Sequence, residues 1–493
     1  MKNIKVLLII FFLITGSLVL SASNDDYYFK INKSFEIFGA VIRELSSNYV
    51  DEIDPEDMID DGIDGMLKNL DPYTTYIDNK DNEDLDIITN GSYSGLGITV
   101  SIRDSMLTII DIHDGFSAQR NGVRIGDRIY KIDSVNLLHQ STDELRKYTR
   151  GKPGTTVILW VIRNGMKDTI AITLQREEIK INNVSYSGMI NDSVGYIKLD
   201  RFSRFSAEEV RNALNELKRN DKFHCLILDL RDNPGGLLES AVAISEIFLK
   251  SGSPIVSTKG RNHKEERMYR SVLPPVDKDT RLAVLINRMS ASASEILAGA
   301  IQDLDRGIIV GERSFGKGLV QTIFDLPYNN SLKITTAKYY TPSGRCIQRL
   351  DFHNKVKSNI DKSDSIFHTK NGRIVIESNG IMPDSLVNEK PFSDFTKQLL
   401  RDDVFFDFAN DYSSELKKLP EGFQVNPKLI SLFKDYINKK NKKYDTPLRA
   451  KILELEKLAK EENVSQKMYK EIENLKNNSS KENEEIFVQN DKD

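Results

Sequence analysis

The sequence is poor in cysteine and histidine, and its charges nearly cancel. Two cysteines in 493 residues, Cys225 and Cys346, cannot form a disulfide framework. Cys225 lies in an apolar run that favours a buried free thiol, although a bridge to Cys346 stays open in an oxidising compartment. With only 6 histidines, a catalytic site that works without histidine has to be considered. A formal net charge of −4 gives no positive bias, so no nucleic-acid partner is expected.

Long apolar runs are also missing, except at the N-terminus. Lys2 and Lys5 precede an apolar stretch from Val6 to Leu20, and small residues follow it. This order is typical of a signal peptide over residues 1–23. The stretch is short for a membrane span, which needs about 20 apolar residues, but an uncleaved anchor remains the alternative. In both cases we expect the rest of the chain to be exported, to the periplasm or cell envelope, with the membrane nearby.

The length predicts two to four domains rather than one core. Residues 27–90 have the polar, periodic pattern of a helical region, and residues 395–476 are helical and charged. Apolar stripes in these terminal regions are typical of a core or of a homodimer contact. Residues 477–493 are polar and are predicted to be disordered.

Residues 91–178 have a different pattern, with short β runs separated by turns. The predicted strands cover residues 97–102, 106–112, 155–163 and 169–175, with one helix over 141–148. The turn formed by Gly95, Leu96, Gly97 and Ile98 opens the first strand, and its N–H groups could converge on a carboxylate. Ordinary hairpin turns have the same composition, and Leu96 and Ile98 are equally suited to a core.

Residues 179–394 alternate strand and helix, which predicts an α/β layered domain. The predicted strands are 194–199, 225–230, 282–286, 322–325 and 331–339, and the helices are 207–219, 238–249 and 294–304. Two turns of small residues follow buried strands and lead into helices. They are Pro234-Gly235-Gly236 and Ser290-Ala-Ser-Ala-Ser-Glu295.

Three serines in the second turn compete as a nucleophile: Ser290, Ser292 and Ser294. Ser292 and Glu295 also form a capping-box pattern, which taken alone favours a structural helix cap. The start of a helix, however, presents free N–H groups with positive partial charge, which suits a tetrahedral oxyanion. The candidate N–H donors are those of Gly235, Gly236 and Ala293.

Lys317 is the candidate base for a serine hydroxyl, which needs a neighbouring base to react at neutral pH. Lysine can act as that base only if burial holds it neutral, and a surface lysine in a glycine loop is the ordinary case. A phosphate-binding loop is excluded because Gly318 stands where a Ser or Thr would hold the metal. In an extended segment Gln321 would share a face with Lys317 and accept a hydrogen bond from its amine. No metal or cofactor is expected.

Together these motifs closely resemble the C-terminal processing (tail-specific) peptidases, over roughly residues 30–390. The motifs are those at 70–76, 229–237, 290–303, 311–321, 340–345 and 380–384. The resemblance implies a multidomain α/β protein: a crotonase/ClpP-like α/β peptidase core, an inserted PDZ domain, and helical N- and C-terminal modules.

Carried over position by position, the resemblance implies Ser292 as nucleophile, Lys317 as base and Gln321 as the residue that supports the lysine. Asp303 matches a family position too and is expected to be structural. The sequence departs from the family where Tyr73-Thr74 replaces the usual His-Ser, and where Cys346 replaces a common Ser.

Residues 91–178 are similar to a PDZ domain at positions 94–98, 121–127 and 150–155. The resemblance implies that Gly95, Leu96, Gly97 and Ile98 bind the terminal carboxylate of a peptide that adds beside the sheet edge. Arg150 would either couple this binding to the active site or be a solvated loop arginine.

The sequence therefore predicts an exported serine endopeptidase that recognises protein C-termini through a PDZ domain. It would cleave them by a Ser–Lys dyad through an acyl-enzyme, and its substrates would be proteins or peptides with apolar C-termini. The alternative is a non-catalytic PDZ receptor or adaptor on a degenerate peptidase fold. The presence of Ser292, Lys317 and Gln321 argues against that alternative.

Overall fold

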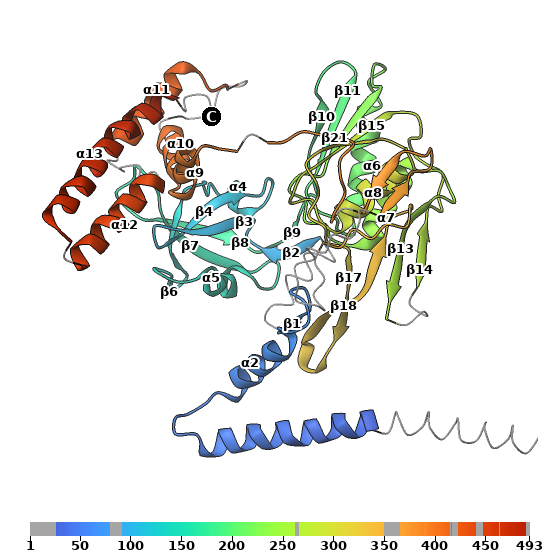
Figure 1. The fold of residues 1–493 in the computed structure, drawn as a ribbon, viewed down its shortest axis with the longest axis horizontal. Helices are drawn as coiled ribbons and strands as arrows, with labels where there is room; N and C mark the ends of the chain where they lie inside the picture. The colour runs from blue at the N-terminus through green and yellow to red at the C-terminus, as the bar shows by residue number, and fades with distance from the viewer. Residues whose placement is uncertain are drawn as a thin grey trace, which may run out of the picture.

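The computed structural model describes residues 26–78, 91–261, 266–349, 365–377, 379–389, 391–414, 416, 423–439, 447–462 and 464–489. The predicted signal peptide, residues 1–23, lies outside this part. Along the chain come N-terminal helices, a PDZ domain, an α/β core and C-terminal helices (Figure 1). The predicted multidomain α/β fold is confirmed. No helix in the described ranges is long and apolar enough to cross a membrane.

The α/β core is built on a six-stranded sheet that is parallel except for its first edge strand, β10. In spatial order its strands are β10 (Val184–Met189), β11 (Val194–Leu199), β12 (Cys225–Asp229), β15 (Arg281–Ile286), β16 (Ile308–Gly311) and β21 (Ser385–Leu386). The helices are α6 (Ser206–Leu217), α7 (Leu238–Phe248) and α8 (Ala293–Asp303). Buried strand residues such as Leu228 and Val284 share one apolar cluster with helix residues such as Ile244 and Leu297. Burial of this shared apolar surface holds the layers together.

A second sheet of five strands packs against the other side of α8. Its strands are β1 (Thr75–Ile77), β13 (Pro254–Gly260), β14 (Arg267–Arg270), β17 (Leu319–Asp325) and β18 (Ser331–Tyr340). β17 and β18 form a hairpin around the 3₁₀ turn Pro327–Asn329, and β18 also pairs with β1 and β13. β1 belongs to the region predicted to be only helical, so this part of the prediction is wrong. A strand of three residues is too short to show an alternating pattern.

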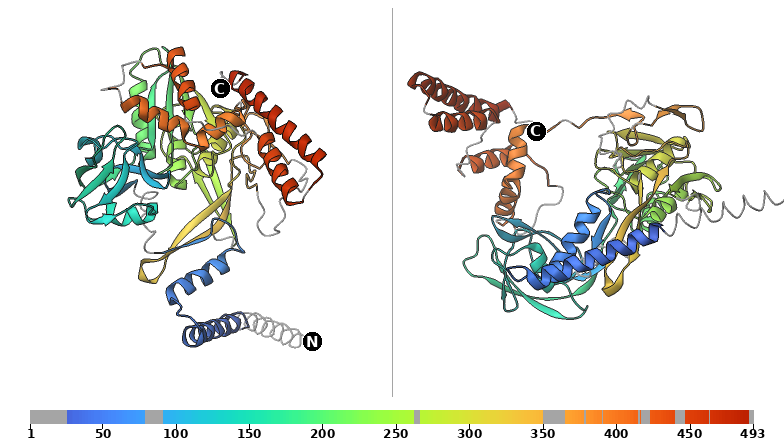
Figure 2. Two further views of the ribbon diagram at one scale, coloured as in Figure 1. Left: turned by 90° about the vertical axis from the view of Figure 1, so that its left-hand side faces the viewer. Right: turned by 60° about the horizontal axis from the view of Figure 1, so that its bottom comes forward.

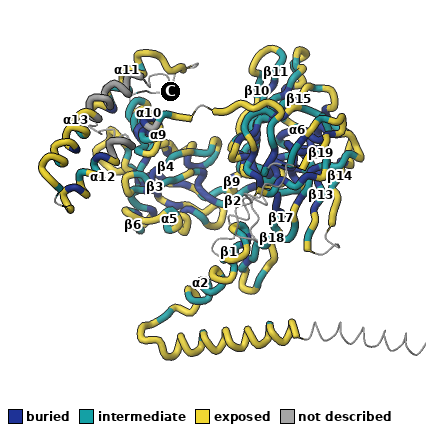
Figure 3. Tube along the Cα trace, in the orientation of Figure 1, coloured by how far each residue is buried: buried dark blue, intermediate teal, exposed yellow. Residues whose placement is uncertain are grey.

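The rest of the N-terminal region is helical and stands away from the core (Figures 1 and 2). Residues 26–48 form one helix, and α2 (Pro55–Leu67) follows, capped by the Asp54 carboxylate. The first helix is exposed along its length (Figure 3). Its apolar side chains include Phe35, which is 70% exposed.

The PDZ domain is a separate β-rich unit with its own apolar core. Its sheet contains β3 (Ile98–Arg103), β4 (Met106–Ile112), β5 (Arg128–Ile132), β7 (Thr156–Ile162) and β8 (Ile170–Gln175), with β6 (Val135–Asn136) on β5. The helices are α4 (Ser117–Arg120) and α5 (Thr142–Thr149). The chain enters through β2 (Ser92–Gly95) and leaves through β9 (Glu177–Lys180), and these two strands pair with each other. The predicted strands and helix of this region are confirmed.

The C-terminal region is a set of helices, of which the first two lie beside the PDZ domain (Figure 1) while the last two stand away from it (Figure 2). The chain reaches it after the hairpin of β19 (Ile366–His368) and β20 (Ile374–Ile376). The helices are α9 (Asp394–Arg401), α10 (Val404–Ser414), α11 (Pro427–Lys439), α12 (Pro447–Glu461) and α13 (Gln466–Gln489). The prediction that residues 477–493 are disordered is wrong up to Gln489. This stretch is polar, but its three Glu residues favour helix and it contains no Pro or Gly.

Polar contacts link this helical region to the PDZ domain. Arg103, at the end of β3, forms an ion pair with Asp403, and its guanidinium lies 4.0 Å from the centre of the Phe406 ring. The amide of Asn164 donates a hydrogen bond to Asp411. Within the described residues, Cys225 and Cys346 do not form a disulfide with each other, which leaves Cys225 outside a bridge as predicted, although it is partly exposed rather than buried.

Asp303 lies at the end of α8, in a buried ion pair with Arg345 at 2.7 Å. The other carboxylate oxygen of Asp303 accepts the N–H of Ser343 at 3.0 Å. Arg345 also donates to Gln302 at 2.6 Å and is 0% exposed. The pair joins α8 to the loop after β18, which agrees with the expected structural role of Asp303.

We expect Asp303→Ala to lower the free energy of unfolding by about 3–5 kcal/mol, because Arg345 would stay buried without a counter-charge. Urea denaturation of the purified protein would measure the change. Glu216→Ala is the control, because it breaks an ion pair with Arg219 whose side chains are 65% and 77% exposed. That loss should stay under about 1 kcal/mol. Equal losses in the two variants would contradict the structural role of Asp303.

Candidate active site

Ser292 lies at the turn between β15 and α8, where the chain passes from the parallel sheet into the helix. It is the N-cap residue, with φ 55° and ψ −112°. A non-glycine residue at positive φ costs about 1–3 kcal/mol, and such strain persists only where the surrounding structure enforces it. The turn therefore presents Ser292 at the start of a helix in a strained, defined conformation.

The three serines of the turn have different surroundings. The Ser290 hydroxyl is buried and donates to the carbonyl of Leu230 at 2.8 Å. The Ser294 hydroxyl is buried and donates to the carbonyl of Asn233 at 3.0 Å. Ser292 is partly exposed, and its hydroxyl donates to no acceptor in the described part of the chain. Of the three, Ser292 is the one whose proton is available for reaction.

A buried carboxylate, Glu295, links this turn to the loop that carries Lys317. One of its oxygens accepts the N–H groups of Ser292 (2.8 Å) and Lys317 (2.9 Å). The other accepts the Ser314 hydroxyl (2.5 Å) and the Gly316 N–H (2.7 Å). Burial raises the pKa of Glu295, and the four hydrogen bonds oppose this by favouring the charged form. The predicted capping box is present, but the sequence pattern gave no sign of the contacts to the lysine loop.

Tyr339 is a second link between the two segments. This fully buried residue of β18 has its hydroxyl within hydrogen-bonding distance of the carbonyl oxygens of Ser292 (3.1 Å) and Lys317. Burial raises the pKa of Tyr339 well above 10, and the nearby Glu295 raises it further. The phenol therefore remains a neutral hydrogen-bond donor.

The side chain of Lys317 is partly buried, and burial lowers the pKa of its amine. The positive charge of Lys333 lowers this pKa further, while Glu295 and Asp71 oppose the shift. The Lys317 Nζ atom lies 4.4 Å from the centre of the Tyr73 ring. In the described residues, no hydrogen bond joins this amine to Ser292 or to Gln321.

Gln321 lies in β17 and makes a different contact from the one expected. Its amide N–H group donates to the Thr335 hydroxyl at 3.4 Å, and that hydroxyl donates to Asp71 at 3.1 Å. A register shift in the β17–β18 pairing falls between Val320 and Gln321. Lys317 itself precedes β17, which begins at Leu319, so the regular extended segment on which the predicted Lys317–Gln321 hydrogen bond depended does not include the lysine. That hydrogen bond is therefore absent from this structure, and a supporting role of Gln321 stays a prediction.

The glycine turn after β12 lies against the serine turn. A Cβ atom on Gly235 would come within 2.9 Å of Ser292 Cβ, so only glycine allows this approach. The N–H of Gly235 is already engaged, because it donates to the Asn233 side chain at 2.9 Å. No partner for the N–H of Gly236 or Ala293 occurs in the described ranges. Of the three predicted oxyanion donors, these two remain available.

In the PDZ domain, the predicted carboxylate loop joins β2 to the edge strand β3. Leu96 is buried in the domain core, and Gly97 has φ 79°. The carbonyls of these two residues are used within the domain, by Ala118 N–H (3.2 Å) and His113 N–H (3.0 Å). Their own N–H groups donate to no acceptor in the described part. One side of β3 is an open sheet edge, and α5 contacts this strand.

Arg150 lies directly beside this loop at the end of α5. Its guanidinium is 3.9 Å from the centre of the Tyr93 ring and donates to the Ser94 carbonyl at 3.4 Å. It is partly buried and so is not the solvated loop arginine that was one of the two expectations.

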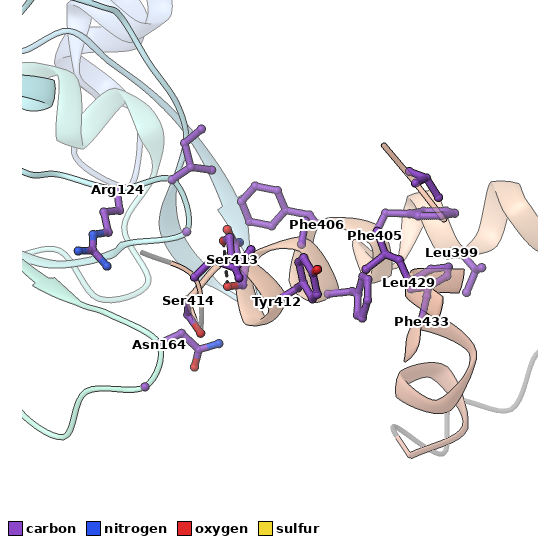
Figure 4. Close-up of a pocket in the computed structure, with 18 of the residues that line it drawn as sticks. Arg124, Asn164, Leu399, Phe405, Phe406, Tyr412, Ser413, Ser414, Leu429 and Phe433 are labelled. Atoms are coloured by element: carbon purple, nitrogen blue, oxygen red, sulfur yellow. Dashed lines mark hydrogen bonds between the residues drawn. The ribbon is translucent and has the colours of Figure 1, made fainter. Parts of the chain in front are cut away.

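A cavity of about 1620 Å³ lies elsewhere, between PDZ loops and the C-terminal helices (Figure 4). Arg124 and Asn164 line it from the PDZ side, and aromatic residues such as Phe405 and Phe433 line it from the helices. None of the residues considered for catalysis or carboxylate binding lines this cavity. In the described ranges there is also no group of three or more His, Cys, Asp or Glu residues arranged to hold a metal ion.

Comparisons with known proteins cover all four regions. Residues 193–361 match the model of peptidase family S41, and residues 94–174 match that of the PDZ domain. Residues 20–81 match the activating protease CtpB N-terminal domain, and 395–493 the C-terminal helical domain of a probable PDZ-protease.

Individual relatives are similar over most of their length. The chain is 37% identical over 319 residues to a carboxy-terminal-processing protease of Bartonella bacilliformis, covering 64% of this chain and 73% of the relative. It is 33% identical over 343 residues to the carboxy-terminal processing protease CtpA of Bacillus subtilis, covering 69% and 71%. A solved structure, the photosystem II D1 C-terminal processing protease, is 25% identical with a TM-score of 0.39, covering 73% and 89%.

The strain at Ser292 can be tested with a pair of substitutions. Ser292→Gly should be more stable than Ser292→Ala by about 1 kcal/mol, because glycine adopts positive φ without strain. At Ser294, which is inside α8, the order should reverse by a similar amount, because glycine disfavours helix. Urea denaturation of the four variants would compare them. The same order at both positions would contradict strain at Ser292.

The link through Glu295 can be tested by Glu295→Gln. The glutamine side chain has the same shape as glutamate. Its NH₂ group, however, would take the place of the oxygen that now accepts the N–H groups of Ser292 and Lys317, and it cannot accept them. We expect a loss of about 2 kcal/mol in the free energy of unfolding and about a 10²-fold loss of activity from the displaced lysine loop. Cleavage rates and thermal unfolding would measure both effects. Glu239→Gln, the same change at an exposed position in the first turn of α7, is the control. Wild-type activity in Glu295→Gln would contradict the link.

Proposed function

Because this chain belongs to peptidase family S41, the C-terminal processing proteases, we propose that it is an exported endopeptidase that cuts near protein C-termini by a Ser–Lys dyad. The chain is a serine protease with a PDZ domain; the location, the catalytic residues and the way a substrate binds are what we propose. The observation that carries the dyad is the Glu295 carboxylate, which accepts the N–H groups of both Ser292 and Lys317. One buried group thus fixes the backbone of the nucleophile relative to that of the base.

In the proposed reaction, neutral Lys317 takes the proton of the Ser292 hydroxyl while its oxygen attacks the peptide carbonyl. The N–H groups of Gly236 and Ala293 stabilise the oxyanion at the start of α8. Lys317 then gives the proton to the leaving amine, and the C–N bond breaks to leave an acyl-enzyme. Water attacks this ester, Lys317 takes the water proton and returns it to Ser292, and the new carboxylate is released.

The environment of Lys317 supports its role as a base. Burial and the charge of Lys333 lower the pKa of its amine from the ordinary value of about 10.4, which increases the neutral fraction near neutral pH. The amine rests against Tyr73 and would have to move to Ser292 when the reaction begins.

The edge of β3 supports recognition of a C-terminus. An extended peptide could add to this edge as a further strand. Its terminal carboxylate would meet the free N–H groups of Leu96 and Gly97, and its apolar last side chain would lie near the domain core. Arg150, held beside the same loop, is placed to couple carboxylate binding to the orientation of the PDZ domain.

Location and assembly rest on the N-terminal sequence. The signal-like segment over residues 1–23 supports export to the periplasm or cell envelope. The exposed apolar side chains of residues 26–48 support a contact with a second copy of the chain.

A cleavage assay tests the function directly. A peptide with an apolar C-terminus should be cut by the wild-type protein, and both Ser292→Ala and Lys317→Ala should slow cleavage by more than about 10³-fold. Lys338→Ala changes an exposed lysine of β18 and should keep wild-type activity. Amidation of the peptide C-terminus should raise KM, because the carboxylate is lost. Binding without cleavage by the wild-type protein would favour the adaptor function instead.

A further inference from the structure

We propose that the aromatic ring of Tyr73 binds the protonated side chain of Lys317 before the reaction begins. This contact helps set the pH at which the lysine becomes available as a base. The proposal rests on the Ser–Lys mechanism proposed above. Its starting point is the position of the Lys317 Nζ atom, 4.4 Å from the centre of the Tyr73 ring and not hydrogen-bonded to Ser292 within the described residues.

The main chain around Tyr73 is held firmly by Asp71. The Asp71 carboxylate accepts the N–H groups of Tyr73 and Thr74, each at 2.9 Å, and the Thr74 hydroxyl at 2.9 Å. Two further bonds fix this turn to β18: Thr335 N–H donates to the Thr74 hydroxyl and the Thr335 hydroxyl to Asp71, both at 3.1 Å. The β1–β18 pairing begins one residue later, with Thr75 opposite Lys333. The ring is therefore positioned by the sheet of the core.

A ring in this position acts differently on the two forms of the lysine. The negative face of an aromatic ring attracts an ammonium group within about 6 Å, and this attraction is stronger where water is excluded. The neutral amine carries no charge for the ring to attract. The ring therefore stabilises the protonated, inactive form, and loss of the proton frees the side chain to move to Ser292.

Four charged groups from other elements also act on this pair. Lys333 on β18 repels the ammonium, while Glu295 on α8 and Asp71 in the turn before β1 attract it. Arg349 acts on Tyr73 from the segment after β18. Burial of the amine favours the neutral form. The ring and the two carboxylates therefore favour the protonated form of Lys317, whereas burial and Lys333 favour the neutral form.

The test is the pH dependence of kcat/KM for the full-length protein on the peptide used above, because its acidic limb reports the ionisation of the free enzyme. Tyr73→Leu keeps an apolar side chain over the amine but removes the ring, so the acidic limb should move to lower pH by about half to one unit. Tyr73→Phe keeps the ring and should leave the limb in place. Tyr73→Trp supplies the ring type that binds cations most strongly, and should move the limb to higher pH. Tyr76→Leu removes a neighbouring tyrosine of β1 whose ring makes no cation contact with Lys317 in the described residues, and should change nothing.

The outcomes are separable. No shift in Tyr73→Leu, or an equal shift in Tyr73→Phe, overturns the proposal, since the second result would assign the effect to the hydroxyl. If Tyr73→Leu fails to fold, Tyr73→Trp decides: an upward shift supports the proposal and an unchanged limb overturns it. Failure of the Ser–Lys mechanism has a different signature, namely no cleavage by the wild-type protein or an unchanged rate in Lys317→Ala.

Discussion

The buried carboxylate of Glu295 is the interaction on which the proposed site depends. It accepts four hydrogen bonds, from the nucleophile turn on one side and from the lysine loop on the other. A buried charge is costly unless its hydrogen-bonding capacity is filled, and here both oxygens are occupied twice. If either loop moved away, the buried carboxylate would lose hydrogen bonds. The carboxylate therefore makes the positions of Ser292 and Lys317 dependent on each other. The Glu295 carboxylate also accepts the N–H of Ser292, and this contact helps to keep the Ser292 backbone in its strained conformation.

Each of the two sheets of the core contributes a different part of this site. The parallel sheet ends in the serine and glycine turns, and its helix α8 supplies a positive N-terminus at the nucleophile. The antiparallel sheet supplies the base loop just before β17, and the Tyr339 hydroxyl of β18 bridges the two turns. α8 lies between the sheets, so the chemistry sits where the two layers meet.

Local patterns in the sequence predicted much of this arrangement. The strands and helices around both turns could be assigned from apolar runs ending in small residues, and the resemblance selected Ser292 from three similar serines. The structure adds a physical basis for that choice, because Ser290 and Ser294 use their hydroxyls to bind the neighbouring loop. What could not be predicted depends on pairing between distant segments. The three-residue strand β1, the irregular register at Gln321 and the lysine-loop contacts of Glu295 leave no periodic trace in the sequence.

The pairing of β1 with β18 has a consequence for how the molecule is made. Thr74 and Thr335, which are bonded to each other, are 261 positions apart in the chain. Contacts between such distant positions form late in folding, because a long loop has to close first. During synthesis the turn that holds Tyr73 and Thr74 can pair with β18 only after β18 has been made. Tyr73 can therefore reach Lys317 only after that point. A chain that ends before β18 therefore lacks the pairing that places Tyr73 beside Lys317.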